Sequence, residues 1–594
     1  MCGFLGVFGN SKFNKIIEDS KVLSHRGKDD EGVVKNDDGA LKFFRLSIND
    51  LSENGNQPFK INNQYIAING EIYNHEDLRL SLEKQNVYVE KGSSDCKIAS
   101  LNLVKNNISD LEGMFAGVIW DTEKKTISLF RDHLGIKPLY YLVDNQSNYL
   151  IYASEIKAIL EIFKDKISNN ELVSYILFNG LDTEETLYEN IKSVKPGEKI
   201  KFWIEKSGEI KSCQTNFFDS NYKILKDPIE VIIPTVEDAL IHAVDLHTKM
   251  DVNYAFQLSG GLDSSLLCAL EKKIFSRNIY TFSISLPDAG KYNEFENQQK
   301  VSSYLNSNHV DIPFTKKDFI EDIEHLSYIN DFPLIHPNSV PIYKLAKIAR
   351  ENFKVLISGE GADELFMGYP KYTYAIHEKT LNLFGKLLFL NNIIPRVGKF
   401  KSLFFLLNNQ KSALKAFLST RREKQNIFNN QFNYDFRKIE KSFDLGKTIQ
   451  NDDMFFSLYW LLSRYDRFTM CANVEGRVPY CDKKLFDICR SIPTKYNLKR
   501  GYKKFILKNI ALKYLPIEIV LQNKIGFSLP LEKWFTDSSF FISYMNYLLK
   551  SDFLSELNIE LNNEIRNCNA ELIIKKDINL AWKIFSIAIW LRNK

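Results

Sequence analysis

The apolar pattern of this chain changes near residue 205, and that change constrains the fold more than any other feature of the sequence. Before it, short apolar runs alternate with clusters of Asp, Asn, Gly or Ser, as in FAGVIWDTEKKTISLFRD, a pattern typical of paired β-strands. From Pro234 onward, apolar runs alternate with longer helical segments. We therefore expect two domains, over residues 2–205 and 228–594, joined by a polar linker around 206–226.

Three apolar runs in the second half predict strands of a parallel sheet: NYAFQL, IYTFSIS and KVLIS. The helix-like segment SSLLCALEKK separates the first two, as a strand–helix–strand unit requires. We expect a doubly wound α/β domain here. Residues beyond about 375 are mostly helical by pattern, and the sequence does not define the order of those helices.

The composition limits the kinds of partner. Of 594 residues, 44% are hydrophobic and 26% charged, which is typical of a globular protein, and the net charge of +4 does not suggest a nucleic-acid partner. The eight cysteines form no CxxC pair, and no uncharged apolar run reaches the 18 or so residues that span a bilayer. We expect a cytoplasmic protein that binds small solutes and does not insert into a membrane.

Cys2 directly follows the initiator Met, which is normally removed before a small residue. Removal would leave a thiol and a free α-amine on one residue. Because the pKa of an α-amine is about 7.7–8.0, the amine could accept the thiol proton near neutral pH. An ordinary small apolar cysteine at the chain end is the alternative for such a start taken alone.

Seven segments follow one another in a fixed order: CGFLGVFG, RLSI, NQPF, NGEIYNH, LEGMFAGVIWD, RDHLGIKPLYY and ASEIKA. In this order they resemble the glutaminase domain of the class II glutamine amidotransferases over most of residues 2–200. The resemblance implies an N-terminal-nucleophile hydrolase fold, a four-layer α/β/β/α sandwich. It also implies that Cys2 attacks the glutamine amide, forms a glutamyl thioester and releases ammonia.

The same resemblance assigns roles around Cys2. Arg45 would pair with the glutamine α-carboxylate as a planar fork, and Asp95 would bind the α-ammonium. Asn69 and Gly70 would form the oxyanion hole. Taken singly, these residues have simpler explanations: a surface ion pair for Arg45, a helix cap for Asp95 and a hairpin turn for Asn69–Gly70. The implied glutamine-binding residues are Arg45, Leu46, Ser47, Ile48, Asn49, Asn69, Gly70, Glu71 and Asp95.

The run NYAFQL leads into SGGLDSS and then into a helical segment, an arrangement suited to anion binding. Backbone N–H groups of such a loop, its serines and the positive helix end can hold a phosphate. The heptapeptide resembles the pyrophosphate loop of ATP pyrophosphatases, which cut ATP between its α and β phosphates. The ATP-binding residues implied by this loop are Ser259, Gly260, Gly261, Asp263, Ser264 and Ser265. The family resemblance described below adds Leu258, Ile284, Ser358 and Gly359 to the implied nucleotide pocket.

The run KVLIS leads into GEGADELFMGY, which places Glu360, Asp363 and Glu364 within five positions. Clustered carboxylates repel one another, so we expect Mg²⁺ to bind with the ATP phosphates, at Asp263 and Asp363. A solvated acidic helix start is the alternative for this segment alone. Both loops follow predicted parallel strands, and open α/β sheets bind ligands at that edge.

Two later segments, YDRFTMCANVEGRVPYCD and LQNKIGFSLPLEKWF, resemble signatures of the glutamine-hydrolysing asparagine synthetase family. The resemblance then covers residues 2 to about 535. It implies that glutamine supplies ammonia while ATP and Mg²⁺ adenylate aspartate, giving asparagine, AMP, pyrophosphate and glutamate. Glu360 would help to form the acyl-adenylate, and Lys524 would stabilise that intermediate and the departing pyrophosphate. The resemblance leaves a homodimer open.

Some positions depart from the family pattern, and they concern mainly the acceptor. Two of them, Met367 and Gln522, lie next to the acidic loop and the Lys524 segment. An altered acceptor pocket, for example for a uronic acid of a surface polysaccharide, is therefore the first alternative. A glutaminase or binding partner with a degenerate synthetase half is the second, although SGGLDSS, GEGADE and Lys524 are intact. The remaining departures are Lys97, Asn293, Tyr480 and Cys481.

Overall fold

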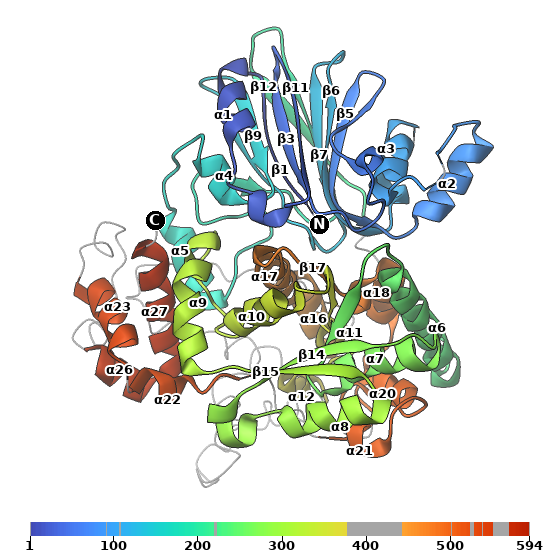
Figure 1. Cartoon of the computed structure of the whole chain (residues 1–594), viewed down its shortest axis with the longest axis vertical. Helices are drawn as coiled ribbons and strands as arrows, with labels where there is room; N and C mark the ends of the chain where they lie inside the picture. Colours follow the sequence, from blue (N-terminus) through green and yellow to red (C-terminus); the bar gives the residue numbers. More distant parts are fainter. Residues whose placement is uncertain are drawn as a thin grey trace, which may run out of the picture.

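The computed structural model describes residues 2–90, 92–105, 108–218, 222–376, 442, 444–499, 502–522, 528–536, 538–550 and 569–592. The first half contains two six-stranded antiparallel sheets, and the second half contains one five-stranded parallel sheet. Figure 1 shows the two halves stacked, with the start of β1 at the junction between them.

The strands of the first half lie in the orders β10-β8-β9-β1-β3-β2 and β12-β11-β7-β6-β5-β4. The strands are β1 (Gly3–Phe8), β2 (Asp30–Asn36), β3 (Gly39–Arg45), β4 (Phe59–Ile61), β5 (Gln64–Ile72), β6 (Gly113–Asp121), β7 (Thr126–Arg131), β8 (Tyr140–Asp144), β9 (Tyr149–Ala153), β10 (Lys192–Ser193), β11 (Glu198–Ile204) and β12 (Ile210–Asn216). The helices of this half are α1 (Asn14–Asp19), α2 (His75–Lys84), α3 (Asp95–Lys105), α4 (Ile156–Leu160) and α5 (Asn169–Phe178).

Side chains that alternate along β1 serve two different cores. Phe4 and Phe8 join a cluster with Trp120 from the second sheet, so this cluster fills the space between the sheets. Leu5 and Val7 belong to the cluster that includes residues of α1 and α4. The outer face of the second sheet packs against α2 and α3. The layers are therefore helix, sheet, sheet and helix, which confirms the predicted sandwich.

The parallel sheet has the order β15-β14-β13-β16-β17. Its strands are β13 (Tyr254–Gln257), β14 (Tyr280–Ser285), β15 (Asn308–Pro313), β16 (Val355–Ile357) and β17 (Glu475–Arg477). The chain builds outward from β13 to β15 and then returns to place β16 on the other side of β13. The carboxyl ends of β13 and β16 thus flank the point where the order reverses, the usual ligand site of a doubly wound sheet. This confirms the predicted fold of the second half.

Most described helices of the second half pack around this sheet, whereas the last ones lie to one side of it (Figure 1). They are α6 (Ile229–Thr248), α7 (Leu262–Lys273), α8 (Phe295–Leu305), α9 (Lys316–Ile329), α10 (Ser339–Ala349), α11 (Ala362–Leu365), α12 (Thr373–Ile376), α16 (Leu445–Asp452), α17 (Leu458–Cys471), α18 (Lys483–Ser491), α19 (Thr494–Asn497), α20 (Phe505–Ala511), α21 (Ile517–Val520), α22 (Leu531–Thr536), α23 (Ser539–Lys550), α26 (Ala570–Lys576) and α27 (Ile578–Arg592). Within the described ranges, no helix is long and apolar enough to cross a lipid bilayer.

Part of the predicted linker is a strand. Ile210–Asn216 forms β12, which pairs antiparallel with β11 at the edge of the second sheet. Most of its residues are exposed, so it lacks the apolar alternation by which a half-buried strand is recognised. The polar pattern marks an edge strand here, and the sheet continues past residue 205.

Buried ion pairs join the two halves. Arg26 of the first half lies 2.8 Å from both Glu155 and Asp466, and the latter belongs to α17 of the second half. Lys137 also reaches Asp466, at 3.2 Å. Helix α5 lies against the second half, where the Tyr175 hydroxyl donates to the Pro333 carbonyl at 2.9 Å. Because isolated buried charges are costly, each half supplies counter-charges that the other requires.

Candidate functional site

Cys2 lies immediately before β1 and is only 6% exposed. Its backbone N–H donates to Asn69 Oδ1 at 3.0 Å, and its Sγ lies 4.0 Å from the Leu46 carbonyl oxygen. Burial raises the pKa of the Cys2 thiol. The thiol therefore needs a nearby base before it can act as a nucleophile.

Asn69 and Gly70 lie inside β5, so the hairpin-turn explanation for this pair is wrong. Asn69 is fully buried, and its Nδ2 has no hydrogen-bond partner in the described structure, although its Oδ1 accepts from Cys2. A buried donor left unpaired beside a nucleophile fits an oxyanion hole. Gly70 has φ +149°, and a Cβ there would lie 2.0 Å from the Met114 carbonyl oxygen. Only glycine fits this position.

Arg45 ends β3 and is 5% exposed, so a surface ion pair is also excluded. Its Nη1 donates to the Ser52 carbonyl at 2.8 Å and to Asn56 Oδ1 at 2.6 Å, and its Nη2 donates to the Asp50 carbonyl. A Cβ at Gly55 would lie 2.0 Å from Arg45 Nη2. These neutral acceptors orient the guanidinium without neutralising its charge, as the binding of a carboxylate requires.

Glu71 and Asp95 are buried close to this site, and burial raises the pKa of both carboxyl groups. Asp95 accepts the Ile72 N–H at 2.7 Å and begins α3. Glu71 Oε2 accepts from Asn49 Nδ2 at 2.7 Å and lies 3.1 Å from Arg477 Nη2. Arg477 belongs to β17, so the second half supplies part of this wall.

The SGGLDSS loop connects β13 to α7. Gly260 has φ +77°, and a Cβ there would lie 2.7 Å from the Gln298 backbone nitrogen. The Ser259 and Ser264 hydroxyls are 3.0 Å apart, and the Gly261 N–H donates to Ser259 Oγ at 3.3 Å. The loop thus curls around the amino end of α7, where backbone N–H groups and the helix dipole favour an anion.

A cavity of about 300 Å³ lies at the carboxyl ends of β13 and β16. The predicted residues that line it are Leu258, Ser259, Asp263, Ser264, Ile284, Ser358, Gly359, Glu360 and Asp363. Three predicted nucleotide residues, Gly260, Gly261 and Ser265, are not part of this lining. The structure therefore brings most of the predicted nucleotide residues around one cavity.

Two cations that pair with carboxylates of this cavity were not predicted. Lys504 Nζ lies 2.7 Å from Asp263 Oδ1 and 2.7 Å from Asp363 Oδ1. Arg464 of α17 lies 2.8 Å from Glu360 Oε1 and donates to Asn338 Oδ1 at 2.7 Å. The mutual repulsion of the acidic cluster pointed to a cation in general. No motif identified these two side chains, which come from distant segments.

These cations offset charge of the acidic cluster in addition to the Mg²⁺ that the sequence predicts there. Lys504 and Arg464 supply counter-charges, and Glu364 accepts from the Tyr369 hydroxyl while burial raises its pKa to about 8. Among the residues that the structure describes, no group of three or more His, Cys, Asp or Glu side chains could hold a metal ion. Two carboxylates fit Mg²⁺ when nucleotide phosphates complete its ligands.

Lys524 lies outside the described residues. Gln522, the departure nearest to it, donates its side-chain N–H to the Gly260 carbonyl and therefore contacts the SGGLDSS loop. Another departure, Tyr480, donates its hydroxyl to the Asp263 carbonyl at 3.1 Å. Positions that depart from the family pattern thus contact the nucleotide loop.

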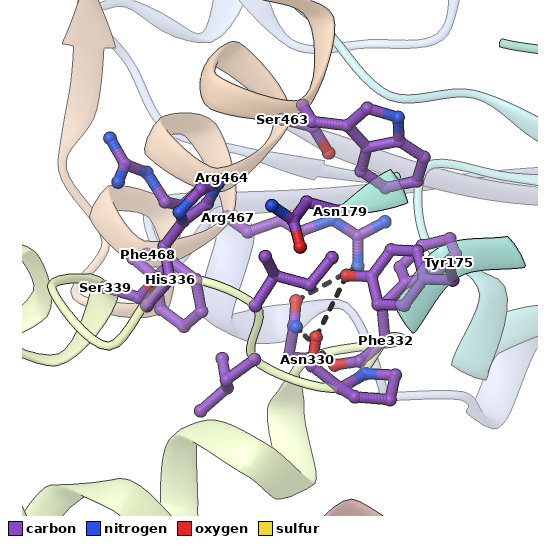
Figure 2. A pocket seen from close by; sticks show the side chains of 14 residues that line it. Tyr175, Asn179, Asn330, Phe332, His336, Ser339, Ser463, Arg464, Arg467 and Phe468 are labelled. Carbon is purple, nitrogen blue, oxygen red and sulfur yellow. Dashed lines mark hydrogen bonds between the residues drawn. The ribbon is translucent and has the colours of Figure 1, made fainter. Parts of the chain in front are cut away.

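A second, smaller cavity of about 30 Å³ lies where the halves meet (Figure 2). Tyr175 and Asn179 line it from the first half, and Arg467 lines it from α17. His336 and Arg464 line both this cavity and the larger one. Burial lowers the pKa of His336 to about 3, which keeps its ring neutral at physiological pH.

The fold and the two sites define a class: an N-terminal-nucleophile half joined to a nucleotide-binding half. Comparison with known families agrees. Residues 1–213 match the glutamine amidotransferase domain, and residues 235–591 match asparagine synthase. The chain belongs to the asparagine synthase family and is a glutamine-hydrolysing ligase of that family.

Several curated relatives share this organisation. The chain is 29% identical over 564 residues to glutamine-hydrolysing asparagine synthetase 1 of Bacillus subtilis (strain 168), covering 90% of this chain and 88% of the relative. It is 32% identical to asparagine synthetase B of Escherichia coli (strain K12), covering 64% and 67% respectively. It is also 32% identical to a putative asparagine synthetase of Methanocaldococcus jannaschii, covering 62% and 76%.

Proposed function

We propose that this protein is a glutamine-dependent asparagine synthetase in which Cys2 releases ammonia and the second half consumes it. The observation that carries the proposal is the unpartnered Asn69 Nδ2 beside the Cys2 backbone, in a chain whose other half surrounds a nucleotide-sized cavity with acidic and basic side chains. The names of the relatives support aspartate as the acceptor.

In the first half, the Cys2 thiolate attacks the side-chain carbonyl carbon of glutamine, and the carbonyl electrons move to the oxygen. Asn69 Nδ2 and the Gly70 N–H stabilise that oxyanion. The carbon–nitrogen bond then breaks, ammonia leaves with the proton taken from the thiol, and water hydrolyses the thioester to glutamate. Arg45 would hold the α-carboxylate, while Asp95 and Glu71 would face the α-ammonium.

This mechanism uses the Cys2 α-amine as the base, so it requires that Met1 be removed. Mass spectrometry of the active protein is expected to give the mass of a chain that begins at Cys2. Retention of Met1 in an active preparation would contradict the mechanism.

In the second half, a carboxylate oxygen of the acceptor attacks the α-phosphorus of ATP, and pyrophosphate leaves. Ammonia then attacks the acyl carbon, and AMP leaves as the amide forms. Asp263 and Asp363 would hold Mg²⁺, which neutralises phosphate charge when it is bound. Lys504 and Lys524 would stabilise the departing pyrophosphate, and Glu360, oriented by Arg464, would act on the adenylation step. We expect Lys524→Ala to fail with either nitrogen source.

Ammonia released into bulk water is protonated and loses its nucleophilicity, so direct transfer between the halves is advantageous. The junction cavity supports such a transfer because it is about the size of one small molecule and shares His336 and Arg464 with the nucleotide cavity. A neutral His336 would not protonate the passing ammonia as an imidazolium would.

The acceptor is expected to bind in a cavity beside the nucleotide. A third cavity of about 830 Å³ shares His336 and Asn338 with the nucleotide cavity, and Asp288, Tyr292 and Lys533 also line it. Its volume and the polar side chains within its mixed lining favour the alternative acceptor, a uronic acid carried on a larger sugar. A cytoplasmic location and a homodimer are further predictions.

Pyrophosphate release with glutamine and ATP tests the proposal when aspartate and uronic acids are offered in parallel. We expect release with aspartate, together with one asparagine per pyrophosphate. Release with a uronic acid but not with aspartate would favour the alternative acceptor. Glutamate release without pyrophosphate from any carboxylate would favour a degenerate second half.

A further inference from the structure

The loop that follows β3 is held by residues of the opposite half. The predicted glutamine-binding stretch consists of Arg45 at the end of β3 and, in this loop, Leu46, Ser47, Ile48 and Asn49. We propose that Lys354, a residue of the second half, positions this loop and thereby sets the affinity for glutamine. The inference rests on the glutaminase function proposed above.

Lys354 reaches both sides of Ser47. Its Nζ lies 2.6 Å from Asp29 Oδ2 and donates to the Ser47 carbonyl at 3.3 Å. The same Asp29 oxygen accepts the Ser47 N–H at 2.9 Å. One ammonium therefore holds the carbonyl directly and holds the amide through the carboxylate. A charge-assisted pair of this kind is stronger than a neutral hydrogen bond.

The second half also holds the next part of the loop. The Asp50 N–H donates to Asp251 Oδ2 at 2.9 Å, and the Asp251 N–H donates to the Ile48 carbonyl at 3.3 Å. Asp251 shortly precedes β13, and Lys354 immediately precedes β16. The Lys354 carbonyl accepts from the Glu475 N–H at 2.8 Å, which ties its backbone to the sheet. The loop thus rests on two neighbouring strands of the parallel sheet.

The position of this loop determines where the glutamine contacts lie. Arg45 precedes Ser47 by two residues, and its Nη2 donates to the Asp50 carbonyl at the far end of the loop. Asn49, between Ser47 and Asp50 in the chain, donates its side-chain N–H to Glu71 at 2.7 Å. A shift of Ser47 therefore displaces both the guanidinium and the Glu71 contact. Lys354 contacts Asp29 and the Ser47 carbonyl rather than the Cys2 thiol or the Arg45 guanidinium, so it is a positioning residue.

Lys354→Met removes the charge and keeps much of the side-chain volume. Both partners of the Lys354–Asp29 pair are about one quarter exposed, so the variant is expected to fold. We expect the KM for glutamine to rise about fivefold or more, with kcat and ammonia-dependent amide formation unchanged. Lys354→Arg, which keeps the charge, should restore most of the affinity.

Lys344→Met is the matched control. Lys344 lies 3.1 Å from Asp318 with nearly the same exposure, 24% and 22%, but both residues belong to the second half. This variant should leave the KM for glutamine unchanged. Calorimetry of glutamine binding to Cys2→Ala, with and without Lys354→Met, should show the same loss of affinity without turnover.

Each result decides between the two proposals. If the unmodified protein releases no glutamate from glutamine, the proposed function fails and the inference fails with it. If it does, and Lys354→Met keeps the KM of the unmodified protein, only the inference is overturned. An equal rise in KM for Lys344→Met, or a loss of ammonia-dependent activity in Lys354→Met, would show a general structural effect and would also overturn it.

Discussion

The two sites of this protein solve the problem of buried charge in different ways. Around Cys2, the key donor is an uncharged amide left without a partner, and the Arg45 guanidinium is oriented by neutral oxygens. Around the nucleotide cavity, carboxylates are paired with Lys504 and Arg464. The first site is thus built before its ligand arrives, whereas the second must exchange ion pairs when nucleotide binds.

The contrast follows from the two folds. In the antiparallel sandwich, β3 and β5 carry Arg45 and Asn69 to the site directly, and paired strands leave little freedom to these side chains. In the parallel sheet, the site is assembled from loops after β13 and β16, and distant segments contribute its cations. Variants can therefore test whether the Cys2 site is preformed and whether the nucleotide site depends on charge compensation.

Cys2→Ala should produce the largest effect. Without the thiol no thioester forms, so glutamine-dependent amide formation should fall at least roughly a thousandfold. Ammonium salts at alkaline pH should still support synthesis, because the second half keeps its own residues. Glutamate and pyrophosphate release are measured in parallel. Loss of both activities would contradict the division of labour between the halves.

Asn69→Asp tests whether the first site is preformed. The substitution keeps an oxygen for the Cys2 N–H and removes the unpartnered Nδ2 donor. We expect kcat for glutamine hydrolysis to fall about a hundredfold, with little change in KM, because the donor acts on the oxyanion. Steady-state glutamate release measures both constants. An unchanged kcat would remove Asn69 from the oxyanion hole.

Lys504→Met tests charge compensation at the second site. The variant leaves Asp263 and Asp363 without their shared cation, so ATP phosphates should meet stronger repulsion. Pyrophosphate release should fall at least about tenfold with either nitrogen source. Glutamate release in the absence of ATP should be retained. A larger loss with glutamine than with ammonia would contradict a role confined to the second site.

The smallest expected effect is on the pH dependence of folding stability, through His133 at the junction between the halves. Burial lowers the pKa of His133 to about 3, and its ring lies 5.6 Å from that of Phe218 and 5.7 Å from that of Phe486. Below pH 6.5 the His133 ring binds a proton in the unfolded chain, whereas in the folded chain it stays neutral until the pH approaches 3. His133 therefore lowers stability as the pH falls toward 3, by up to about 1.4 kcal/mol per pH unit.

His133→Leu should make that decline shallower. Thermal unfolding of both proteins between pH 7 and pH 5 measures it, with the difference in stability shifting toward the variant at the lower pH. Equal slopes would show that His133 takes up its proton in the folded state.

The sequence was more informative about the first site than about the second. The residues predicted around Cys2 lie in short segments whose order along the chain is distinctive. Arg45 lies on β3, and Asn69 and Glu71 lie on β5, all in one domain. Both sheet classes and the strands β13, β14 and β16 were predictable from apolar runs. The place of Asn69 inside β5 was not foreseen, because taken alone the Asn69–Gly70 pair also fits a hairpin turn.

Residues that act across the junction were beyond prediction. Arg477 ends the short strand β17 and Lys354 immediately precedes β16. Only the packing of the halves shows that these charged residues reach Glu71 and Ser47. β17 has three residues, two of them charged, so it shows no strand pattern. Lys504 and Arg464 stand in no recognised motif, and β12 lacks apolar alternation because both its faces are largely exposed.

The shared ion pairs at the junction have a consequence for inheritance. A gene divided between β12 and α6 would yield two polypeptides, one with Arg26 deprived of Asp466 and one with Arg477 deprived of Glu71. Each fragment would expose unpaired charges on a surface that is buried in the whole protein. Because each portion supplies counter-charges that the other lacks, the two portions should be inherited together as one coding region.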